Sequence, residues 1–351
     1  LTIASTESVT LSNRNGGTSF SDPGLTIQGV NSSGVATQTE LRFSDNTTAQ
    51  NMLAISNAGA TDPAYIIVQG LYVNWAAMTV TTHNKNFIVR SNGSTDNNIR
   101  VQCNKFEMAL SQGGTAISDH ALLIADGGRF GEIRYNYFLN CDDGGGSQLM
   151  RFHHRGQVEV HHNVLVLNAA TAFSGIWASF GNNDGNSTDH RFYNNTVYVK
   201  STATGVPYIW ASLDSTGSTG GNADKQCHSN VIGHFPAALN ARYMQGFAGV
   251  ASTTYDRVIG YTLFSVPNGN SWDAAGPYQV PWDPDDSDSP EGTSRWATDV
   301  LTTSDVFFDK ATPWSWANIN GSGYSMTLAG DLRIADTSNW RTMALDGGVP
   351  G

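Results

Sequence analysis

Two short patterns of alternating apolar and polar residues recur in the middle of the chain, between residues 120 and 232. The first pattern occupies residues 120–128, 148–156, 175–183 and 208–216. The second pattern occupies residues 131–138, 158–165, 190–197 and 225–232. Every copy of the second pattern contains an Asn, at Asn136, Asn163, Asn195 and Asn230, with steps of 27, 32 and 35 residues, and Asn104 marks an earlier copy. A repeat of this length predicts stacked units that bury their apolar faces against one another.

Residues at fixed distances from each Asn are alike from one copy to the next. Those three before it and two after it are apolar: Val101, Ile133, Val160, Phe192 and Cys227, then Phe106, Phe138, Leu165, Val197 and Ile232. Those four before it and two before it are mostly polar: Arg100, Glu132, Glu159, Arg191 and Gln226, then Gln102, Arg134, His161, Tyr193 and His228. Because side chains alternate along a strand, we expect the apolar columns to face a core and the polar columns to face outward. We expect the Asn itself to form a left-handed bend, since its short amide tolerates that geometry.

This repeat resembles the right-handed parallel β-helix of the pectin-lyase-like superfamily, in which each coil carries two or three short strands. The resemblance covers roughly residues 20–235 and implies an all-β, single-chain solenoid with long surface loops. One coil for roughly 30 residues predicts about eight coils. We predict a lead-in or cap in residues 1–24, the parallel β-helix in 25–265, and a loop-rich C-terminal capping region in 266–351.

Composition supports short strands joined by polar turns. The chain has 351 residues, 37 of them Gly, and only 14% are charged. Its net charge of −11 argues against nucleic acid or an anionic membrane surface as a partner, and no apolar run is long enough to cross a membrane. We expect Cys103, Cys141 and Cys227 to be small buried side chains, although one disulfide with one thiol left over is an alternative.

The first pattern suggests a surface for sugar binding. With Ile124, Phe152, Ala178 and Ala211 set as inward positions, the outward columns hold Leu123, Arg151, Trp177 and Trp210, then Ala125, His153, Ser179 and Ser212, then Gly127, Arg155, Gly181 and Asp214. Indole faces pack on sugar rings, and guanidinium groups pair with carboxylates or sulfates. The predicted substrate-binding residues are Trp177, Trp210, Arg155, Arg134 and Asp214. In the alternative, connections such as residues 139–148 cover the two tryptophans, which are then ordinary core.

Residues 151–162 are the densest ionisable stretch of the chain. His153 and His161 are candidates for acid–base chemistry, because imidazole titrates near neutral pH. The predicted catalytic set is His153, Arg151, His161, Tyr193 and Asp126. We expect His154 and His162 to have structural roles. Ion pairs across strands, Arg100–Glu132 and Glu159–Arg191, are also expected to be structural.

Two reactions fit these candidates. A β-eliminating lyase would use Arg151 or Arg155 to neutralise a uronate carboxylate, and a His or Tyr as base and acid. A glycoside hydrolase would need two carboxylates, taken from Asp126, Asp142, Asp143 and Asp214. Adjacent carboxylates such as Asp142 and Asp143 are more often a solvated turn than a catalytic pair. We place neither the Lys/Arg pair of the alginate and chondroitin lyases of this architecture nor the Asp triad of polygalacturonases.

The resemblance extends to polysaccharide lyases and to phage tailspikes. It implies an extracellular or virion-surface protein that binds an acidic polysaccharide or cell-surface glycan, with or without cleaving it. The alternative is a non-catalytic virion structural, decoration or adhesin protein that uses the β-helix as a rigid scaffold. A homotrimer would suit assembly into a virion. We predict no cofactor; the acidic residues Asp283, Asp285, Asp286, Asp288 and Glu291 are either a solvated loop or a calcium site.

Overall fold

A computed structural model of the protein describes the backbone of part of the chain. The described residues are 2–3, 9–12, 17–43, 50–51, 53–56, 64–74, 85–88, 97–107, 122–125, 128–139, 148–153, 157–167, 176–181, 190–199, 208–213, 225–234, 242–245, 257–260, 263–265, 295–296, 315–319 and 326–329. Side chains are described for residues 17–42, 65–74, 98–107, 131–138, 157–165, 191–196 and 229–230.

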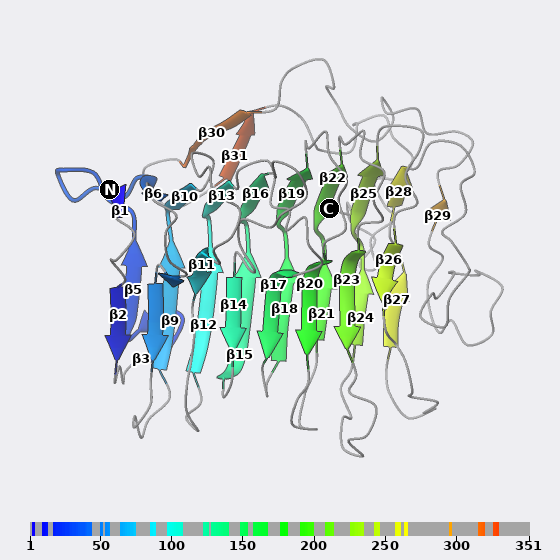
Figure 1. The fold of residues 1–351 in the computed structure, drawn as a ribbon, viewed down its shortest axis with the longest axis horizontal. Coiled ribbons are helices and arrows are strands. Elements are labelled where there is room, and N and C mark those ends of the chain that lie inside the picture. Colours follow the sequence, from blue (N-terminus) through cyan, green and yellow to red (C-terminus); the bar gives the residue numbers. More distant parts are fainter. Residues whose placement is uncertain are drawn as a thin grey trace.

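Most described strands lie in three sheets whose neighbouring strands are parallel (Figure 1). The eight-stranded sheet contains β5 (Leu25–Gln28), β9 (Ala64–Gln69), β12 (Asn97–Gln102), β15 (Gly128–Arg134), β18 (Gln157–His161), β21 (His190–Tyr193), β24 (Lys225–His228) and β27 (Arg257–Gly260). The ten-stranded sheet contains β1 (Thr2–Ile3), β6 (Thr39–Phe43), β10 (Leu71–Asn74), β13 (Lys105–Glu107), β16 (Tyr137–Leu139), β19 (Val164–Leu167), β22 (Thr196–Val199), β25 (Val231–His234), β28 (Leu263–Ser265) and β29 (Arg295–Trp296).

The third sheet and three strand pairs complete the described structure. The seven-stranded sheet contains β7 (Gln50–Asn51), β11 (Lys85–Ile88), β14 (Leu122–Ala125), β17 (Gln148–His153), β20 (Ile176–Gly181), β23 (Tyr208–Leu213) and β26 (Arg242–Gln245). The pairs are β2 (Val9–Ser12) with β8 (Leu53–Ser56), parallel, and two antiparallel pairs, β3 (Gly17–Ser19) with β4 (Asp22–Pro23) and β30 (Ser315–Ile319) with β31 (Met326–Ala329).

From β9 to β28 the chain visits the eight-stranded, the ten-stranded and the seven-stranded sheet in turn, over and over. Each strand therefore pairs with the strand one repeat later, which is the order of a solenoid. The predictions of an all-β protein and of parallel sheets are confirmed for the described residues, which contain no helix. In particular, they contain no helix that could cross a membrane. The number of coils and the domain boundaries stay predictions.

The second sequence pattern forms two strands in two different sheets, divided at the Asn. The described members of the apolar columns on both sides of this corner are buried, as predicted: Val101, Ile133, Val160 and Phe192 have no exposed surface. Across the corner, the rings of Phe106 and Phe138 stack with centroids 4.9 Å apart and planes 9° apart. Like side chains therefore stack on like from one coil to the next at this position.

The prediction that the Asn itself takes the left-handed conformation is wrong. The residue before it does, and Cys103, Tyr135, His162, Asn194 and Ser229 have φ values from 51° to 54°. The Asn is buried, and its side chain holds the corner together: Asn136 Nδ2 donates to Val101 O at 2.9 Å and to Asn163 Oδ1 at 3.1 Å. The physical reason is that buried backbone groups at a corner need partners, and the amide supplies both a donor and an acceptor.

The same bonds recur from Asn104 to Asn230 and form an asparagine ladder. Each backbone N–H donates to Oδ1 of the next Asn, at 3.0 Å, 3.0 Å, 3.0 Å and 2.9 Å along the series Asn104, Asn136, Asn163, Asn195 and Asn230. At the N-terminal end, where Leu71 takes the place of an Asn, its backbone N–H donates to Asn104 Oδ1 at 3.0 Å. The backbone N–H at the corner of each of these coils therefore has its hydrogen-bond acceptor in the next coil.

The predicted alignment of the first pattern is wrong in part of the seven-stranded sheet, by two residues between β17 and β20 and by one residue between β20 and β23. Arg151 pairs with Leu123 as expected, but it pairs with Ser179 on the other side, and Trp210 pairs with Ala178. Trp177 and Trp210 therefore do not share a column with Arg151. The shared tetrapeptide IWAS, at 176–179 and 209–212, suggested the other alignment. Register is set by the pairing of whole coils, and a slip of one residue exchanges the two faces of a strand.

The neighbouring columns change for the same reason. His153 pairs with Ala125 as expected but with Gly181 instead of Ser179, and Gly181 pairs in turn with Leu213 instead of Asp214. Phe152 pairs with Phe180. The predicted column of Arg155 and Asp214 falls on residues outside the described part of the chain.

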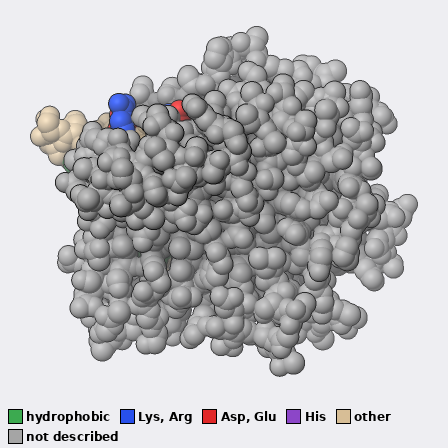
Figure 2. Space-filling view, viewed as in Figure 1, with side chains coloured by type: hydrophobic (Ala, Val, Ile, Leu, Met, Phe, Trp, Pro, Cys, Tyr) green, Lys and Arg blue, Asp and Glu red, His purple; other side chains and the backbone are tan. Residues whose placement is uncertain are grey.

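The N-terminal end of the ten-stranded sheet carries a small polar group on its surface. Figure 2 shows basic and acidic side chains of described residues close together above the end of the molecule where β6, β10 and β13 lie. Arg42 pairs with Glu40 at 3.0 Å, and Asn74 Nδ2 donates to Glu40 Oε1 at 2.7 Å. Lys105 pairs with Glu107 at 2.8 Å. These are satisfied surface pairs, and they supply control positions for the experiments below.

Candidate functional site

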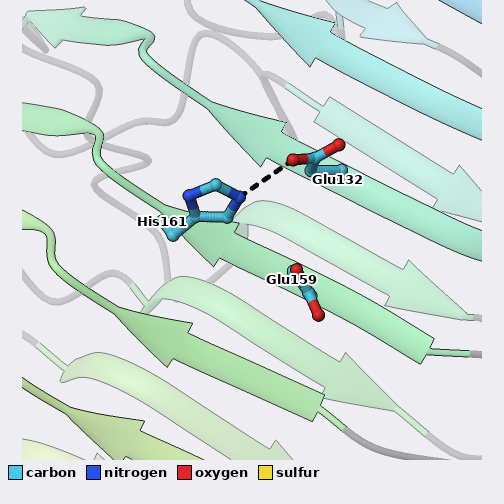
Figure 3. Close-up of side chains that lie close together, drawn as sticks. All are labelled: Glu132, Glu159 and His161. Atoms are coloured by element: carbon cyan, nitrogen blue, oxygen red, sulfur yellow. Dashed lines mark hydrogen bonds and ion pairs between the residues drawn. The ribbon is translucent and has the colours of Figure 1, made fainter. Parts of the chain in front are cut away.

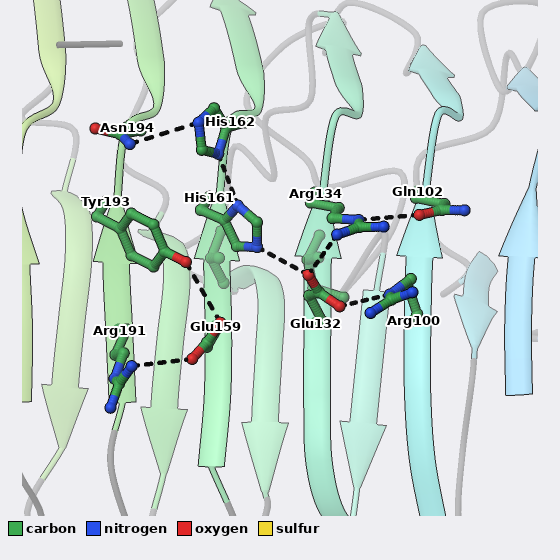
Figure 4. A network of polar contacts seen from close by, with 12 residues as sticks. Arg100, Gln102, Glu132, Arg134, Glu159, His161, His162, Arg191, Tyr193 and Asn194 are labelled. Atoms are coloured by element: carbon green, nitrogen blue, oxygen red, sulfur yellow. Dashed lines mark hydrogen bonds and ion pairs between the residues drawn. The ribbon is translucent and has the colours of Figure 1, made fainter. Parts of the chain in front are cut away.

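The outer face of the eight-stranded sheet and its corner with the ten-stranded sheet carry a connected group of polar and aromatic side chains (Figure 4). It is built from three columns: the residues four, two and one before each Asn of the ladder. We call it the corner cluster; its members are Arg100, Glu132, Arg134, Tyr135, Glu159, His161, His162, Arg191, Tyr193 and Asn194. Strand alternation places the first two columns on the outer face, and the left-handed bend turns the third column outward beside them.

Glu132 lies at the centre of the corner cluster. Its Oε2 accepts a bond from Arg100 Nε at 2.5 Å, and its Oε1 accepts from Arg134 Nη1 and faces His161 Nε2, both at 3.0 Å. The side chain is 7% exposed. Burial raises the pKa of Glu132, but the bonds from His161 and Arg100 and the charges of Arg100 and Arg134 outweigh it and lower the pKa to about 2. Glu132 is therefore a fixed, ionised carboxylate.

Glu159 is the register partner of Glu132 on the next strand. It accepts bonds from Gln157 Nε2 at 2.6 Å, Arg191 Nη1 at 3.3 Å and the Tyr193 hydroxyl at 3.4 Å. Burial, and then the charge and hydrogen bond of Glu159, raise the pKa of Tyr193 above its ordinary value of 10.0. Tyr193 therefore keeps its proton at neutral pH and can act as a donor rather than a base.

His161 and His162 join the strand face to the bend. Their Nδ1 atoms lie 2.7 Å apart, and Asn194 Nδ2 lies 3.5 Å from His162 Nε2. The rings of His161 and His162 are nearly perpendicular, with centroids 5.0 Å apart, and the ring of Tyr135 lies 5.2 Å from that of His162. Tyr135 is 39% exposed, so one edge of this aromatic group faces solvent.

A row of hydrogen-bonded side chains continues the middle column towards the N-terminal end of the sheet. Arg134 Nε donates to Gln102 Oε1 at 2.9 Å, Gln102 Nε2 donates to Gln69 Oε1 at 2.7 Å, and Gln69 Nε2 donates to Gln28 Oε1 at 3.3 Å. Near this end, the Arg100 guanidinium lies 3.9 Å from the centroid of the Phe20 ring. The outer face is thus polar and hydrogen-bonded over β5, β9, β12 and β15.

Three residues of the cluster have the ligand types that bind a metal ion. Glu132, Glu159 and His161 place ligand atoms within 4.8 Å of one another (Figure 3). Both oxygens of Glu132 already accept bonds from arginines, however, and a third guanidinium, that of Arg191, pairs with Glu159. A divalent cation would have to displace these positive groups, so the residues do not fit a resident metal. The acidic stretch between Asp283 and Glu291 lies outside the described residues.

The structure brings together three of the predicted site residues. Arg134, His161 and Tyr193 pair in register on β15, β18 and β21, as predicted. Arg151 and His153 lie on β17 and the two tryptophans on β20 and β23, all in the seven-stranded sheet, so they belong to a different face. Asp126, Asp142, Asp143, Arg155 and Asp214 lie outside the described residues, as do His154 and Cys141.

The sequence analysis missed Tyr135, His162 and Asn194 as members of the site. They stand directly before an Asn of the ladder, where strand alternation assigns no face because the backbone is left-handed. The only signal was their shared position, which a search for a third column would have found. The predicted ion pairs Arg100–Glu132 and Arg191–Glu159 are confirmed, at 2.5 Å and 3.3 Å. Glu132 in addition contacts His161, which links the ion pairs to the histidines.

Comparison of the chain with protein-family models, with curated proteins and with solved structures finds no match. The class of the protein therefore rests on its own structure: the described residues are all-β, lie mainly in parallel sheets and carry a basic and aromatic cluster on one outer face.

Proposed function

We propose that the protein is a right-handed parallel β-helix, similar to the pectin-lyase-like superfamily, that binds an acidic polysaccharide along the outer face of its eight-stranded sheet. The observation that carries the proposal is the charge of the corner cluster. Its three arginines exceed its two carboxylates, on a chain with a net charge of −11. A local positive excess on an acidic protein favours a polyanion at that place.

The exposed side chains of the cluster suit a uronate unit. Tyr135 offers a ring face to the sugar, and the Arg134 guanidinium carbon lies 5.5 Å from the centroid of that ring. A sugar packed on Tyr135 would bring its carboxylate within reach of Arg134. Arg191 is 33% exposed two strands further along and would meet the next acidic group of the polymer. Parallel strands repeat every ~4.8 Å, so the face offers side chains on the scale of single sugar rings.

β-Elimination is the reaction that suits the cluster better than hydrolysis. A hydrolase needs one carboxyl group that is protonated at working pH to act as an acid. Glu132 is ionised and bound to two arginines, so it does not supply this group. A lyase needs a cation beside the substrate carboxylate and a base, and the cluster has arginines next to histidines. We propose that the protein acts outside the cell, as a secreted or a virion-surface protein, because such polymers are extracellular.

Binding and cleavage are tested together on a panel of uronate polymers and neutral polysaccharides. We expect binding to the acidic polymers alone, weakened by salt, with release of unsaturated uronate ends that absorb in the ultraviolet. Arg191→Gln should weaken binding at least several-fold. Arg42→Gln is the matched control, because Arg42 is also paired with a Glu and is 52% exposed but lies on the ten-stranded sheet.

Two outcomes would count against the proposal. Equal binding of neutral and acidic polymers would show that the arginines do not select the polymer. Binding of no polymer at all would favour the alternative of a structural or adhesive protein, in which the corner cluster only stiffens the scaffold.

A further inference from the structure

The hydrogen bonds around the two histidines form a chain with a fixed direction. It runs from Asn194 Nδ2 to His162 Nε2, from His162 Nδ1 to His161 Nδ1, and from His161 Nε2 to Glu132 Oε1. At each end of this series of hydrogen bonds, the residue can be only a donor or only an acceptor. The ionised carboxylate of Glu132 can only accept, and an amide nitrogen can only donate.

These two ends decide where the protons of both histidines lie. His161 must carry its proton on Nε2 to donate to Glu132, so its Nδ1 is the acceptor. The 2.7 Å contact between the Nδ1 atoms then requires His162 to carry its proton on Nδ1. His162 Nε2 is left with the lone pair. We infer that Glu132, His161 and His162 form a proton relay whose proton-accepting atom is His162 Nε2.

A proton added to His162 Nε2 is stabilised through the relay. His162 then donates through Nδ1 to His161 Nδ1, and His161 donates through Nε2 to the negative carboxylate of Glu132. The carboxylate thus stabilises the positive charge on His162. A carboxylate that orients an imidazole and supports its charged form is a general device for making a histidine a better base. Here one more histidine lies between the carboxylate and the base.

Asn194 can form a hydrogen bond with His162 in both protonation states of the relay. Its Oδ1 is buried and, among the described residues, accepts no hydrogen bond, while its Nδ2 is 3.5 Å from His162 Nε2. Rotation of the amide by half a turn exchanges the two atoms, and Oδ1 then accepts from a protonated Nε2. The amide thus donates to the neutral relay and accepts from the charged one.

Charged and titratable groups surround the relay on every strand packed against it. They are Arg100 from β12, Glu132 and Arg134 from β15, Tyr135 from the following bend, Glu159 from β18 itself, and Arg191 and Tyr193 from β21. Glu159 is occupied by Arg191, Gln157 and Tyr193. Glu132 is therefore the carboxylate that acts on the histidines, and the arginines hold it ionised.

The left-handed bend fixes where the His162 ring lies. Its φ of 53° is shared by the bend residues of the neighbouring coils, and the same position three coils earlier is Gly70, with a φ of 69°. The bend holds the imidazole between Tyr135, His161 and Asn194.

On the proposed function, a bound uronate takes the place of the Asn194 amide at His162 Nε2, and its acid group is held at Arg134. The proton leaves C5 for His162 Nε2, and its electron pair becomes the C4=C5 double bond. The bond from C4 to the bridging oxygen breaks, and that oxygen takes a proton from water. His162 then returns its proton to water. His162 would be the catalytic residue, and His161 a positioning residue that acts through it.

The relay itself is tested on the full-length chain without any substrate. Nitrogen-15 NMR of the imidazoles should show neutral His161 protonated on Nε2 and neutral His162 protonated on Nδ1, with the added proton going to His162 Nε2. Glu132→Gln should change the tautomers of both rings, whereas Glu40→Gln on the ten-stranded sheet should change neither. A neutral His162 that carries its proton on Nε2 would overturn the relay.

The role of the relay in cleavage is tested separately. His162→Asn suits the bend, since Asn194 occupies the same position in the next coil. We expect it to lower kcat by about 100-fold or more, with polymer affinity and stability kept. Cleavage at the original rate would show that His162 is not the base. If the NMR result holds but no polymer is bound, the proposed function fails and the relay stands; if polymer is cleaved but the tautomers are reversed, the relay alone fails.

Discussion

The imidazole of His161 stacks face to face on the ring of Tyr193, with centroids 4.8 Å apart and planes 6° apart. The two residues are register partners on β18 and β21. His161 contacts Glu132, and the Tyr193 hydroxyl contacts Glu159, so this stack joins the two halves of the corner cluster.

The stack predicts a difference between two substitutions of Tyr193. Tyr193→Phe keeps the ring and loses a long hydrogen bond of 3.4 Å, so we expect a loss of less than about 1 kcal/mol of unfolding free energy. Tyr193→Ala removes the ring and should cost about 3 kcal/mol. Chemical denaturation of the two variants measures this. Equal losses would show that the hydroxyl, and not the stack, is the stabilising part.

The asparagine ladder predicts a large effect of a small substitution. Asn163→Ala would leave Asn136 N–H and Nδ2, and the carbonyl of Ile133, without their partners at 3.0 Å, 3.1 Å and 2.8 Å. We expect a loss of about 4 kcal/mol, because buried polar groups without partners are costly. Asn31→Ala is the control: it also removes two bonds of 2.9 Å, but in an exposed turn, and should cost about 1 kcal/mol. Similar losses for the two variants would contradict a special role of the ladder.

The lowered pKa of Glu132 predicts how the free energy of unfolding depends on pH. Its pKa in the folded protein is about 2, below the ordinary value of 4.5, so protonation favours unfolding. The contribution of Glu132, about 3 kcal/mol, is complete above pH 4.5 and is lost as the pH falls from 4.5 towards 2. Denaturation at a series of pH values should show this loss in the original protein.

The same series in Glu132→Gln should be flatter over that range. The variant should be less stable at neutral pH, because Arg100 and Arg134 remain with no carboxylate between them. Its deficit should shrink as the pH falls towards 2. The hydrogen bond from Asn74 lowers the pKa of Glu40 less than the pKa of Glu132 is lowered, so Glu40→Gln, at a more exposed pair, should flatten the series much less. A deficit that stays constant with pH would show that the ionisation of Glu132 does not contribute.

The left-handed bends predict an unusual order of two substitutions at Tyr135. Ala is ordinarily a better replacement than Gly, because Gly loses more backbone freedom on folding. At a φ of 53° the order should reverse, and Tyr135→Gly should be about 1 kcal/mol more stable than Tyr135→Ala. Both variants remove the same ring, so its packing cancels in the comparison. The ordinary order in thermal or chemical denaturation would argue against the bend.

Alternation along the strands was enough to predict the buried columns and the row of Arg134, His161 and Tyr193. It works there because the strands are regular and each face has one environment. It could not place His162 or Asn194, since a left-handed residue between two strands belongs to neither face. It also misaligned Trp210, because a pattern of period two fixes the face of a strand but not which residues of two coils pair.

The role of Glu132 illustrates another limit of sequence reasoning. Its pairing with Arg100 follows from their equal distance to the ladder Asn, and the structure confirms it. Its contact with His161 joins different columns, two residues apart on neighbouring strands. Such diagonal contacts depend on side-chain direction and burial, which the pattern of polar positions does not contain.

All side-chain amides of the asparagine ladder point the same way, with the nitrogen of each Asn donating to the oxygen of the Asn one coil later. The amide dipoles therefore add along the axis of the stack, and the ladder has a negative and a positive end. At the negative end the backbone N–H of Leu71 closes the series. Growth or shortening by whole coils in evolution would leave every remaining bond intact. The length of the outer face of the eight-stranded sheet can thus change in steps of one coil without redesign of the corner.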